Sequence, residues 1–376
     1  MKIIADKDIP FLFGVFEPFC DIEYFHHSKI NNQIVLGADV LIIRTRTICN
    51  AELLKGSKVK FIASATIGFD HIDVDYCKKE GISWKNSPGC NSGAVKQWFM
   101  SAIFALIAKQ NMNIRDITLG VVGVGHVGSK VASFAEAIGL RVLLNDPPRE
   151  RVEGNCNFRV MQSIIRECNL ISFHVPLIHN GPDKTFHLVN QSFIESLQPG
   201  TMLINCSRGE VIDTNAFLSV GKKKKLKAVL DVFENEPSIS QELASMASII
   251  TPHIAGYSIE GKANATTQVV QRVAEYLEIP LNDWQPDYEL PGYLNQLVVD
   301  AKNKENDEVM AEVICRTYAV EKDDALLRKN LNNFENIRSS YVYRYEPQDW
   351  TIGLLNGGAE IIQSLKAIGF QVKAVG

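Results

Sequence analysis

The stretch from Asp116 to Asp146 reads DITLGVVGVGHVGSKVASFAEAIGLRVLLND. A valine-rich run at residues 117–122 has the length of a strand and leads into the turn GVGHVG at residues 123–128. A helical pattern with apolar residues on one face follows, and a second strand at residues 142–144 ends just before Asp146. A G-x-G-x-x-G turn between a strand and a helix, followed by an acidic residue after the next strand, is typical of dinucleotide binding.

Each part of this turn has a physical role. Gly123 allows the tight turn, Gly125 lets the backbone approach a pyrophosphate, and Gly128 lets the helix pack on the strand. Unpaired N–H groups at the helix N-terminus attract the phosphates. Asp146 can accept hydrogen bonds from the adenosine ribose and would repel a 2′-phosphate, which favours NAD over NADP. The alternative interpretation is a βαβ unit that binds no cofactor.

Residues 1 to about 92 alternate short apolar runs with helical patterns, which indicates a parallel sheet wrapped by helices. We expect strands at residues 2–5, 22–25, 40–44, 61–65 and 82–85, and helices near residues 10–19, 52–55 and 75–80. This part of the chain contains no glycine fingerprint, so it is not the nucleotide site. A long apolar helix at residues 92–109 leads from it into the opening stretch.

The alternation resumes after Asp146. We expect strands at residues 170–175, 202–205, 229–232 and 249–251, and helices near residues 161–168, 191–197, 215–220 and 241–246. Together with the two opening strands these make at least six, enough for a doubly wound parallel sheet. A further helix is expected to begin at Ser258, a plausible N-cap, and to end near Leu277.

The last part of the chain differs in character. Residues 280–291 are rich in Pro, Asp and Asn and are interpreted as a linker. Beyond it we expect a helix at residues 307–318, a charged bend at EKDDALLRKN (321–330), and a final strand, helix and strand. An aromatic cluster contains Tyr341, Tyr343, Tyr345 and Trp350. The cluster suggests a homodimer held by this segment, and the alternative is a monomeric addition whose aromatic residues fill its own core.

Composition limits the classes of function. A chain of 376 residues is too long for one core and suggests two or three domains. A net charge of −4 gives no reason to expect nucleic acid or a membrane as partner, and the Lys222–Lys225 run is interpreted as a solvated helix end. The eight cysteines lack C-x-x-C spacing, which favours thiols of a reducing cytoplasm over disulfides or a metal site. The opening MKIIADKDIP enters a strand directly, without the apolar core of a signal peptide.

Three charged residues follow strands of the second half of the chain. Arg208 comes after MLINCS, Glu236 lies in DVFENEP, and His253 comes after IITP. Ligands of doubly wound sheets bind at the carboxyl ends of the strands. An arginine can clamp a carboxylate and polarise the adjacent C–O bond. A histidine can take a hydroxyl proton while hydride leaves the same carbon, and a nearby glutamate makes it a stronger base.

Each of these residues also has a structural interpretation when it is taken alone. Arg208 can be a surface salt-bridge partner, Glu236 a turn residue and His253 a loop histidine. Asp231, at the end of the strand before Glu236, can meet the positive nicotinamide ring.

The stretches GVVGVGHVG, INCSRGEVID, LDVFENEP and TPHIAG together resemble the D-isomer-specific 2-hydroxyacid dehydrogenases over residues 1 to about 280. The similarity is closer to the branch of that family that oxidises 4-phospho-D-erythronate in vitamin B6 synthesis. The stretches that carry it are MKIIADKDIP, SATIGFDHID, NSPGCNSGAV, NDPPR, HIAGYSIEGKANATTQV, EKDDALLRK and FENIRSSY. They extend the resemblance over nearly the whole chain.

The resemblance implies roles for single residues. Catalysis falls to Arg208, Glu236 and His253, in the chain order of the family. The implied substrate contacts are Thr45, Thr66 and Tyr257. The implied NAD contacts are Gly123, Gly125, His126, Val127, Gly128, Asp146, Val175, Ser207, Asp231 and Gly256. Val175 departs from the family, because relatives often have a threonine there and valine lacks the hydroxyl. The run Arg44-Thr45-Arg46 also departs, since relatives often have serine and then an uncharged residue.

The implied architecture is α/β and has three parts. Residues 1–92 with 256–285 form a flavodoxin-like, substrate-binding lid domain, residues 93–255 a doubly wound Rossmann domain that binds NAD, and residues 286–376 a small α+β dimerisation domain. The implied reaction is the NAD-dependent oxidation of 4-phospho-D-erythronate to 2-oxo-3-hydroxy-4-phosphobutanoate. The alternatives are another D-2-hydroxyacid dehydrogenase, for example one acting on 3-phosphoglycerate, and a non-catalytic NAD-sensing co-regulator.

A 2-hydroxy acid with a distal phosphate needs cationic groups at both ends, and Arg208 serves only the carboxylate. Arg44 and Arg46 close the strand expected at residues 40–44, and side chains two apart on a strand point the same way. Both are therefore expected to reach one phosphate, and Arg344 can add a third charge from the partner subunit. The alternative is that these arginines pair with acidic neighbours.

Overall fold

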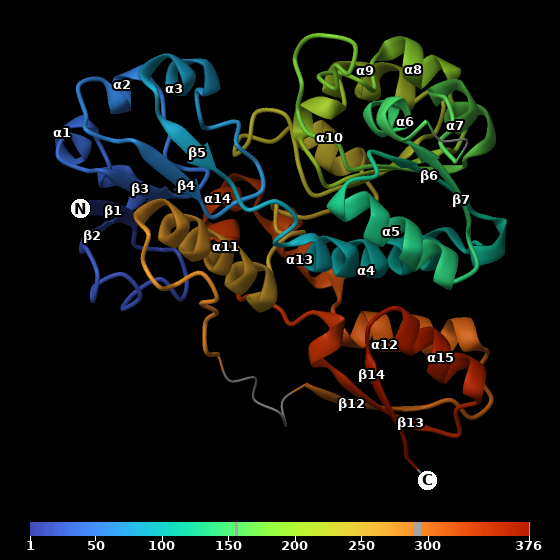
Figure 1. Cartoon of the computed structure of the whole chain (residues 1–376). Helices are drawn as coiled ribbons and strands as arrows, with labels where there is room; N and C mark the ends of the chain where they lie inside the picture. Colours follow the sequence, from blue (N-terminus) through green and yellow to red (C-terminus); the bar gives the residue numbers. More distant parts are fainter. Residues whose placement is uncertain (155–156, 289–294, 376) are drawn as a thin grey trace. The chain divides into compact units, whose positions relative to one another are not determined.

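The computed structural model describes residues 1–154, 157–288 and 295–375, and it divides into two compact units (Figure 1). Unit 1 is Met1–Asn91 with Ser258–Glu289, and unit 2 is Ser92–Tyr257 with Leu290–Gly376. The last part of the chain thus shares a unit with the nucleotide-binding motif, and the division into three domains stays a prediction. The part of the expected linker beyond residue 288 lies outside the described residues.

Unit 1 is built on a five-stranded parallel sheet in the order β2-β1-β3-β4-β5, the flavodoxin-like order. Its strands are β1 (Lys2–Asp6), β2 (Asp21–Phe25), β3 (Val40–Ile43), β4 (Phe61–Ser64) and β5 (Ser83–Lys85). All residues of β3 and β4 are buried, as expected of strands covered on both faces. The strands predicted for this part of the chain and its fold class are confirmed.

The helices of unit 1 are α1 (Asn32–Val35), α2 (Ala51–Leu54), α3 (Val74–Glu80) and α11 (Ile259–Leu277). The predicted start of α11 is confirmed, because Ser258 Oγ accepts a hydrogen bond from the Gly261 N–H at 2.9 Å. The helix predicted near residues 10–19 is wrong. That segment forms turns, in which Phe11 and Gly14 have positive φ values of 64° and 86°. Prolines at both of its ends also oppose a continuous helix.

Unit 2 contains a six-stranded parallel sheet in the order β11-β10-β9-β8-β6-β7. Its strands are β6 (Thr118–Val122), β7 (Arg141–Asn145), β8 (Leu170–Phe173), β9 (Met202–Asn205), β10 (Lys227–Leu230) and β11 (Ile249–Ile250). From β6 the chain adds β7 on one side and then β8 to β11 on the other, so the strand order reverses between β6 and β8. Doubly wound sheets bind ligands at such a reversal. The predicted doubly wound sheet is confirmed.

Helices of unit 2 up to residue 257 connect these strands. They are α4 (Ser92–Gln110), α5 (His126–Ala137), α6 (Pro147–Glu153), α7 (Met161–Glu167), α8 (Gln191–Ser196), α9 (Thr214–Ala216), a π-helical turn (Phe217–Gly221) and α10 (Gln241–Met246). The long helix α4 is buried on all sides along most of its length, because α5 and helices from the end of the chain pack around it. No helix of the described residues is long and apolar enough to cross a membrane.

The last part of unit 2 adds a three-stranded parallel sheet in the order β12-β13-β14. Its elements are β12 (Gln296–Asp300), α12 (Asn306–Thr317), α13 (Val320–Lys329), α14 (Phe334–Ser339), β13 (Thr351–Leu355), α15 (Ala359–Ala367) and β14 (Gln371–Ala374). The predicted charged bend at 321–330 is wrong, because this segment forms α13. Val320, Asp324 and Leu327 lie on the buried face of the helix, and the remaining charged residues lie on the other face.

This C-terminal segment shares its core with the nucleotide-binding sheet. Leu327, Phe334 and Ile337 belong to the same buried cluster as Phe173 and Ile250 of the sheet. A second cluster joins residues of α12 to residues of α4 and α5. The segment therefore shares buried side chains with the nucleotide-binding sheet and its helices.

Candidate active site

The glycine turn after β6 has the geometry that a dinucleotide requires. Gly123 has φ of 84°, and a Cβ there would lie 2.6 Å from the His174 carbonyl oxygen. A Cβ at Gly128 would overlap the Gly123 carbonyl oxygen, so the helix lies directly against the turn. A Cβ at Gly125, by contrast, would meet no atom within 4 Å, and Gly125 is the N-cap of α5 without a side-chain cap. The open space beside a helix N-terminus fits a pyrophosphate.

Asp146 follows β7 and is bonded to this turn. Its Oδ2 accepts a hydrogen bond from the Val124 N–H at 2.7 Å, and its Oδ1 accepts one from the Arg149 N–H at 3.1 Å. The Arg149 guanidinium donates to the Val124 carbonyl oxygen at 2.5 Å and pairs with Glu153 at 2.6 Å. A negative carboxylate thus lies at the glycine turn itself, while a second carboxylate engages the adjacent arginine.

His253 and Glu236 form a hydrogen-bonded pair. His253 Nδ1 lies 2.8 Å from Glu236 Oε2, and Glu236 Oε1 accepts the Phe233 N–H at 2.9 Å. Burial by itself would raise the pKa of the Glu236 carboxyl, but the charges of His253 and Arg338 and these hydrogen bonds outweigh burial and lower it. Because an ionised carboxylate only accepts hydrogen bonds, Nδ1 carries the proton and Nε2 of a neutral His253 is left as the acceptor.

The loop that carries His253 is fixed by a buried carboxylate. Asp231, which is 1% exposed, accepts hydrogen bonds from Thr251 Oγ1 at 2.5 Å, the Ile254 N–H at 2.8 Å and the Ala255 N–H at 2.9 Å. Burial raises the pKa of Asp231, and His253 and the three hydrogen bonds oppose that rise. These contacts hold His253 at φ of 57°, a left-handed conformation that costs energy for a residue with a side chain. Contact of Asp231 with the nicotinamide ring stays a prediction.

Arg208 lies in a loop that is packed against the loop of Glu236. Asn205 donates to the Arg208 carbonyl oxygen at 2.8 Å and accepts from Ser207, which shapes the turn after β9. Arg208 Nη1 donates to the Ser207 carbonyl oxygen at 2.8 Å. A Cβ at Gly209 would overlap the Phe233 carbonyl group and lie 2.5 Å from the Glu234 nitrogen. Only glycine lets the two loops touch backbone to backbone.

The predicted residues of unit 2 gather at one edge of the six-stranded sheet. Every strand pair of this sheet is parallel, so all carboxyl ends lie on the same side. In sheet order from β11 to β7, the residues after the strands are His253 with Gly256 and Tyr257, then Asp231 and Glu236, Ser207 and Arg208, Val175, the glycine turn, and Asp146. Arg208, Glu236 and His253 therefore follow three neighbouring strands, β9, β10 and β11.

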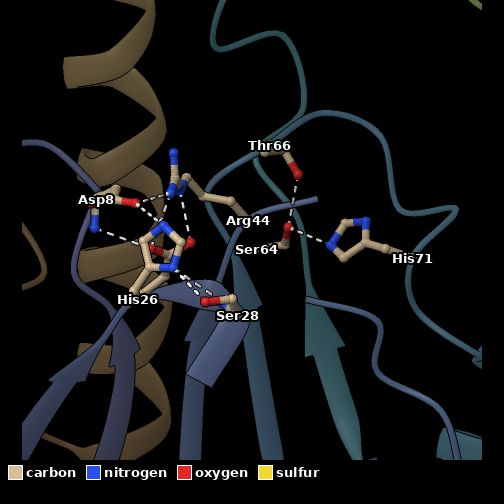
Figure 2. Close-up of polar contacts among 8 residues, drawn as sticks. Asp8, His26, Ser28, Arg44, Ser64, Thr66 and His71 are labelled. Carbon is tan, nitrogen blue, oxygen red and sulfur yellow. Dashed lines mark hydrogen bonds and ion pairs between the residues drawn. The ribbon is translucent and has the colours of Figure 1, made fainter. Parts of the chain in front are cut away.

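Arg44 of unit 1 is part of an ion-pair cluster (Figure 2). Its Nε lies 2.8 Å from Asp6 Oδ2, and its Nη2 lies 3.0 Å from Asp6 Oδ1 and 2.9 Å from Asp8 Oδ2. Strand β3 ends at Ile43, and Thr45 and Arg46 are in a turn, so the argument from side-chain alternation along a strand is wrong. Phosphate contacts of Arg44 and Arg46 stay predictions.

Thr66, a predicted substrate contact, ends a buried chain of hydroxyl and imidazole groups (Figure 2). Its Oγ1 lies 2.8 Å from Ser64 Oγ and donates to the Gly68 carbonyl oxygen at 3.1 Å, and Ser64 Oγ lies 3.1 Å from His71 Nε2. Since Ser64 and His71 are buried, the chain fixes the orientation of Thr66 within unit 1.

Among the residues that the structure describes, one group of side chains has the spacing of metal ligands. Atoms of Asp8, His26 and His27 lie within 4.8 Å of one another. His26 Nδ1 is 2.8 Å from Ser28 Oγ, and the Asp8 carboxylate is already paired with the Arg44 guanidinium (Figure 2). The cation beside Asp8 competes with a metal ion, so the group is better described as an ion-pair cluster.

Comparison with known proteins identifies the chain. Residues 94–255 match the model of the D-isomer specific 2-hydroxyacid dehydrogenase, NAD binding domain. The chain is 44% identical to erythronate-4-phosphate dehydrogenase of Bacteroides thetaiotaomicron, over 94% of this chain and 99% of the relative. It is 36% identical to the enzyme of the same name from Photorhabdus laumondii over the full length of both. The chain belongs to the erythronate-4-phosphate dehydrogenases, within the D-isomer specific 2-hydroxyacid dehydrogenase family. It is an NAD-dependent dehydrogenase.

Solved structures support the fold of this dehydrogenase. NAD-bound 3-phosphoglycerate dehydrogenase of Entamoeba histolytica has a TM-score of 0.64 at 24% identity, covering 77% of this chain and 99% of that one. D-lactate dehydrogenase of Aquifex aeolicus, solved with NAD and lactic acid, has a TM-score of 0.58 at 25% identity and covers 74% of this chain and 96% of that one. About a quarter of the chain lies outside each of these matches.

The dehydrogenase site includes contacts that the sequence pattern did not indicate. Arg344, which is 9% exposed, donates to the carbonyl oxygens of Ile254 at 3.0 Å, Ala94 at 3.0 Å and Ala255. Its Nε donates to Gln97 Oε1 at 3.0 Å. The expectation that Arg344 reaches a phosphate from the partner subunit is wrong, because its guanidinium is buried and holds the His253 loop of its own chain. No local pattern marks such a residue.

Gly209 provides a test of the loop packing. We expect Gly209→Ala to lower kcat/KM on the order of 10²-fold, because a misplacement of about 1 Å in a catalytic group has that effect. Dehydrogenase activity is measured by NADH absorbance, and thermal unfolding shows whether the variant folds. Gly358→Ala is the matched control, since a Cβ there would meet no atom within 4 Å. Unchanged activity in a folded Gly209→Ala protein would contradict the role given to this contact.

Proposed function

We propose that this chain oxidises 4-phospho-D-erythronate at C2 to (R)-3-hydroxy-2-oxo-4-phosphooxybutanoate with NAD, a step of pyridoxal 5′-phosphate biosynthesis. The name shared by its full-length relatives supports this substrate. The observation that carries the reaction type is the 2.8 Å hydrogen bond between His253 Nδ1 and Glu236 Oε2 at the sheet edge that also holds the glycine turn. Described cysteines are all free thiols, which fits a reducing cytoplasm.

In this proposal His253 is the general base. Its Nε2 accepts the proton of the C2 hydroxyl, and the carboxylate of Glu236 stabilises the imidazolium that forms. NAD, which the glycine turn and Asp146 would hold, would supply the acceptor for the hydride of C2. Arg208 holds the substrate carboxylate through its planar fork of N–H donors, which orients C2 and polarises its C–O bond. The buried Asp231 keeps the His253 loop rigid while the proton moves.

The base assignment predicts that His253→Asn folds but loses activity. Loss of a general base typically lowers the rate on the order of 10²–10⁴-fold. The assay follows NADH absorbance with 4-phospho-D-erythronate, 3-phosphoglycerate and D-erythronate, and we expect turnover of the first to exceed that of the other two. The control is His179→Asn, which changes an exposed histidine. Near-normal turnover in His253→Asn would point to another base, and a preference for 3-phosphoglycerate would contradict the substrate.

The position of Asp146 predicts the choice of cofactor. We expect kcat/KM to be higher with NAD than with NADP, and we expect Asp146→Ser to narrow the difference by removing repulsion of the 2′-phosphate. Serine is also a good N-cap, so α6 keeps its start in the variant. Steady-state kinetics with both cofactors measure the ratio. An unchanged preference would assign the discrimination to Arg149 or to the shape of the pocket.

We also propose a homodimer formed through the C-terminal sheet. Two of the aromatic residues do not support it, because Tyr341 donates to Asp323 and the rings of Tyr341 and Tyr343 contact Tyr257 in the same chain. The support is the sheet itself. Helices α12 and α15 pack against one side of it (Figure 1). Val298 on β12 points to the other side and is 55% exposed. Two copies of this open sheet face, related by a two-fold axis, present the same surface to each other and can pack together.

Val298→Asp tests the dimer. Two-fold symmetry would bury both new carboxylates unpaired, which is costly, so we expect the variant to sediment as a monomer at concentrations where the parent is a dimer. Val152→Asp is the control, because Val152 is 87% exposed on α6, away from the C-terminal sheet in sequence and fold. A Val298→Asp protein that remains dimeric would place the contact elsewhere.

A further inference from the structure

An arginine from the C-terminal segment lies against the histidine–glutamate pair. Arg338, on α14, has its Nη1 3.9 Å from Glu236 Oε2, the same oxygen that lies 2.8 Å from His253 Nδ1. The side chains of Arg338 and Glu236 are each 18% exposed. Arg338 Nε is buried and has no hydrogen-bond partner among the described residues. The guanidinium is thus largely removed from water beside the Glu236 carboxylate.

The helix that carries Arg338 is held against the Glu236 loop by aromatic packing. Phe334 is fully buried, and its ring meets the Phe233 ring edge to face at a centroid distance of 6.1 Å. Phe233 in turn donates its N–H to Glu236 Oε1 at 2.9 Å. Helix α14 therefore reaches both oxygens of Glu236, one through Arg338 and the other through the residue on which Phe334 packs.

The charged and titratable groups near the pair come from several elements. They are Asp231 and Glu236 after β10, His253 and Tyr257 after β11, and Glu335 and Arg338 on α14. Burial lowers the pKa of the Arg338 guanidinium, but Tyr257, Glu236 and Glu335 raise it more, so Arg338 is a cation. Asp231, which also interacts with His253, is committed to three hydrogen bonds in its loop.

We propose that Arg338 is a positioning residue of the dehydrogenase reaction, which acts through Glu236 to hold the carboxylate in place and to keep His253 neutral. The proposal rests on the function proposed above. A positive charge beside Glu236 Oε2 opposes a second positive charge on the imidazole bonded to that oxygen. His253 is then ready to take the hydroxyl proton, and the C-terminal segment is part of the catalytic apparatus as well as of the core.

The sign of the effect is testable through the pH dependence of oxidation. The neutral form of His253 is the base, so kcat/KM falls as the pH falls and the imidazole takes up a proton. Removal of the Arg338 charge makes the imidazolium easier to form. We expect Arg338→Gln to move the acid-side midpoint to higher pH by roughly half a unit to one unit, a shift typical of losing a like charge near a titrating group. Arg338→Lys keeps the charge and should keep the midpoint near that of the parent.

A matched control separates this role from a structural one. Arg328→Gln also removes an arginine of the C-terminal segment, where Arg328 pairs with Asp324 at 2.8 Å and donates to the carbonyl oxygens of Ala244 and Ala247. We expect that change to lower the thermal unfolding midpoint without moving the acid-side midpoint. A merely structural Arg338 would behave in the same way.

Histidine NMR of the full chain gives a readout that needs no substrate. The C2–H resonance of His253, assigned by its loss in His253→Asn, should titrate at higher pH in Arg338→Gln than in the parent or in Arg338→Lys. An unchanged or lower titration midpoint in Arg338→Gln overturns the proposal. If the parent fails to oxidise 4-phospho-D-erythronate, the proposed function fails while the NMR titration still decides the role of Arg338.

Discussion

The buried carboxylate of Asp231 is the constraint on which the candidate site depends. The Asp231 side chain is buried from solvent. The energetic cost of burying it is offset because Thr251 Oγ1 and the N–H groups of Ile254 and Ala255 all donate hydrogen bonds to it. Thr251 Oγ1 also accepts a hydrogen bond from Trp98 Nε1 of α4 at 3.0 Å. One carboxylate thereby joins the ends of β10 and β11 to the long buried helix and holds His253 in a left-handed conformation.

The same loop is held from its other side by the C-terminal segment. Arg344 uses its guanidinium to satisfy the carbonyl oxygens of Ile254 and Ala255, while Asp231 satisfies the N–H groups of these two residues. The Ile250 N–H, at the end of β11, donates to Asp324 of α13 at 2.7 Å. A loop whose backbone is bound on both sides is rigid, which suits the role of general base proposed for His253. The C-terminal segment therefore stabilises the His253 loop of its own chain, whether the protein is a monomer or a dimer.

Much of the fold and of the candidate site could be predicted from the sequence for a simple reason. In a parallel sheet all carboxyl ends share an edge, so residues placed after Met202–Asn205, Lys227–Leu230 and Ile249–Ile250 must come together if those runs are neighbouring strands. The strand pattern and the residue types predict that Arg208, Glu236 and His253 lie at one edge of the sheet, and their catalytic roles are implied by the family resemblance. The glycine turn could also be predicted from the sequence, because a side chain at Gly123 or Gly128 would overlap neighbouring atoms and only glycine fits there.

What the sequence by itself determined is thus what depends on neighbouring positions: the strands, the glycine turn, the N-cap Ser258 and the residues that follow each strand. Only the tertiary structure decided which distant groups meet. The pairing of Arg44 with Asp6 requires β1 and β3 to be adjacent in the sheet. The burial of Arg344 requires the C-terminal segment to pack on α4 and the His253 loop, and the burial of Arg338 requires α14 to pack on the Glu236 loop. Residue periodicity reports the buried face of an element. It carries no information about the partner that covers that face, because many apolar faces of similar size are energetically equivalent until the chain is folded.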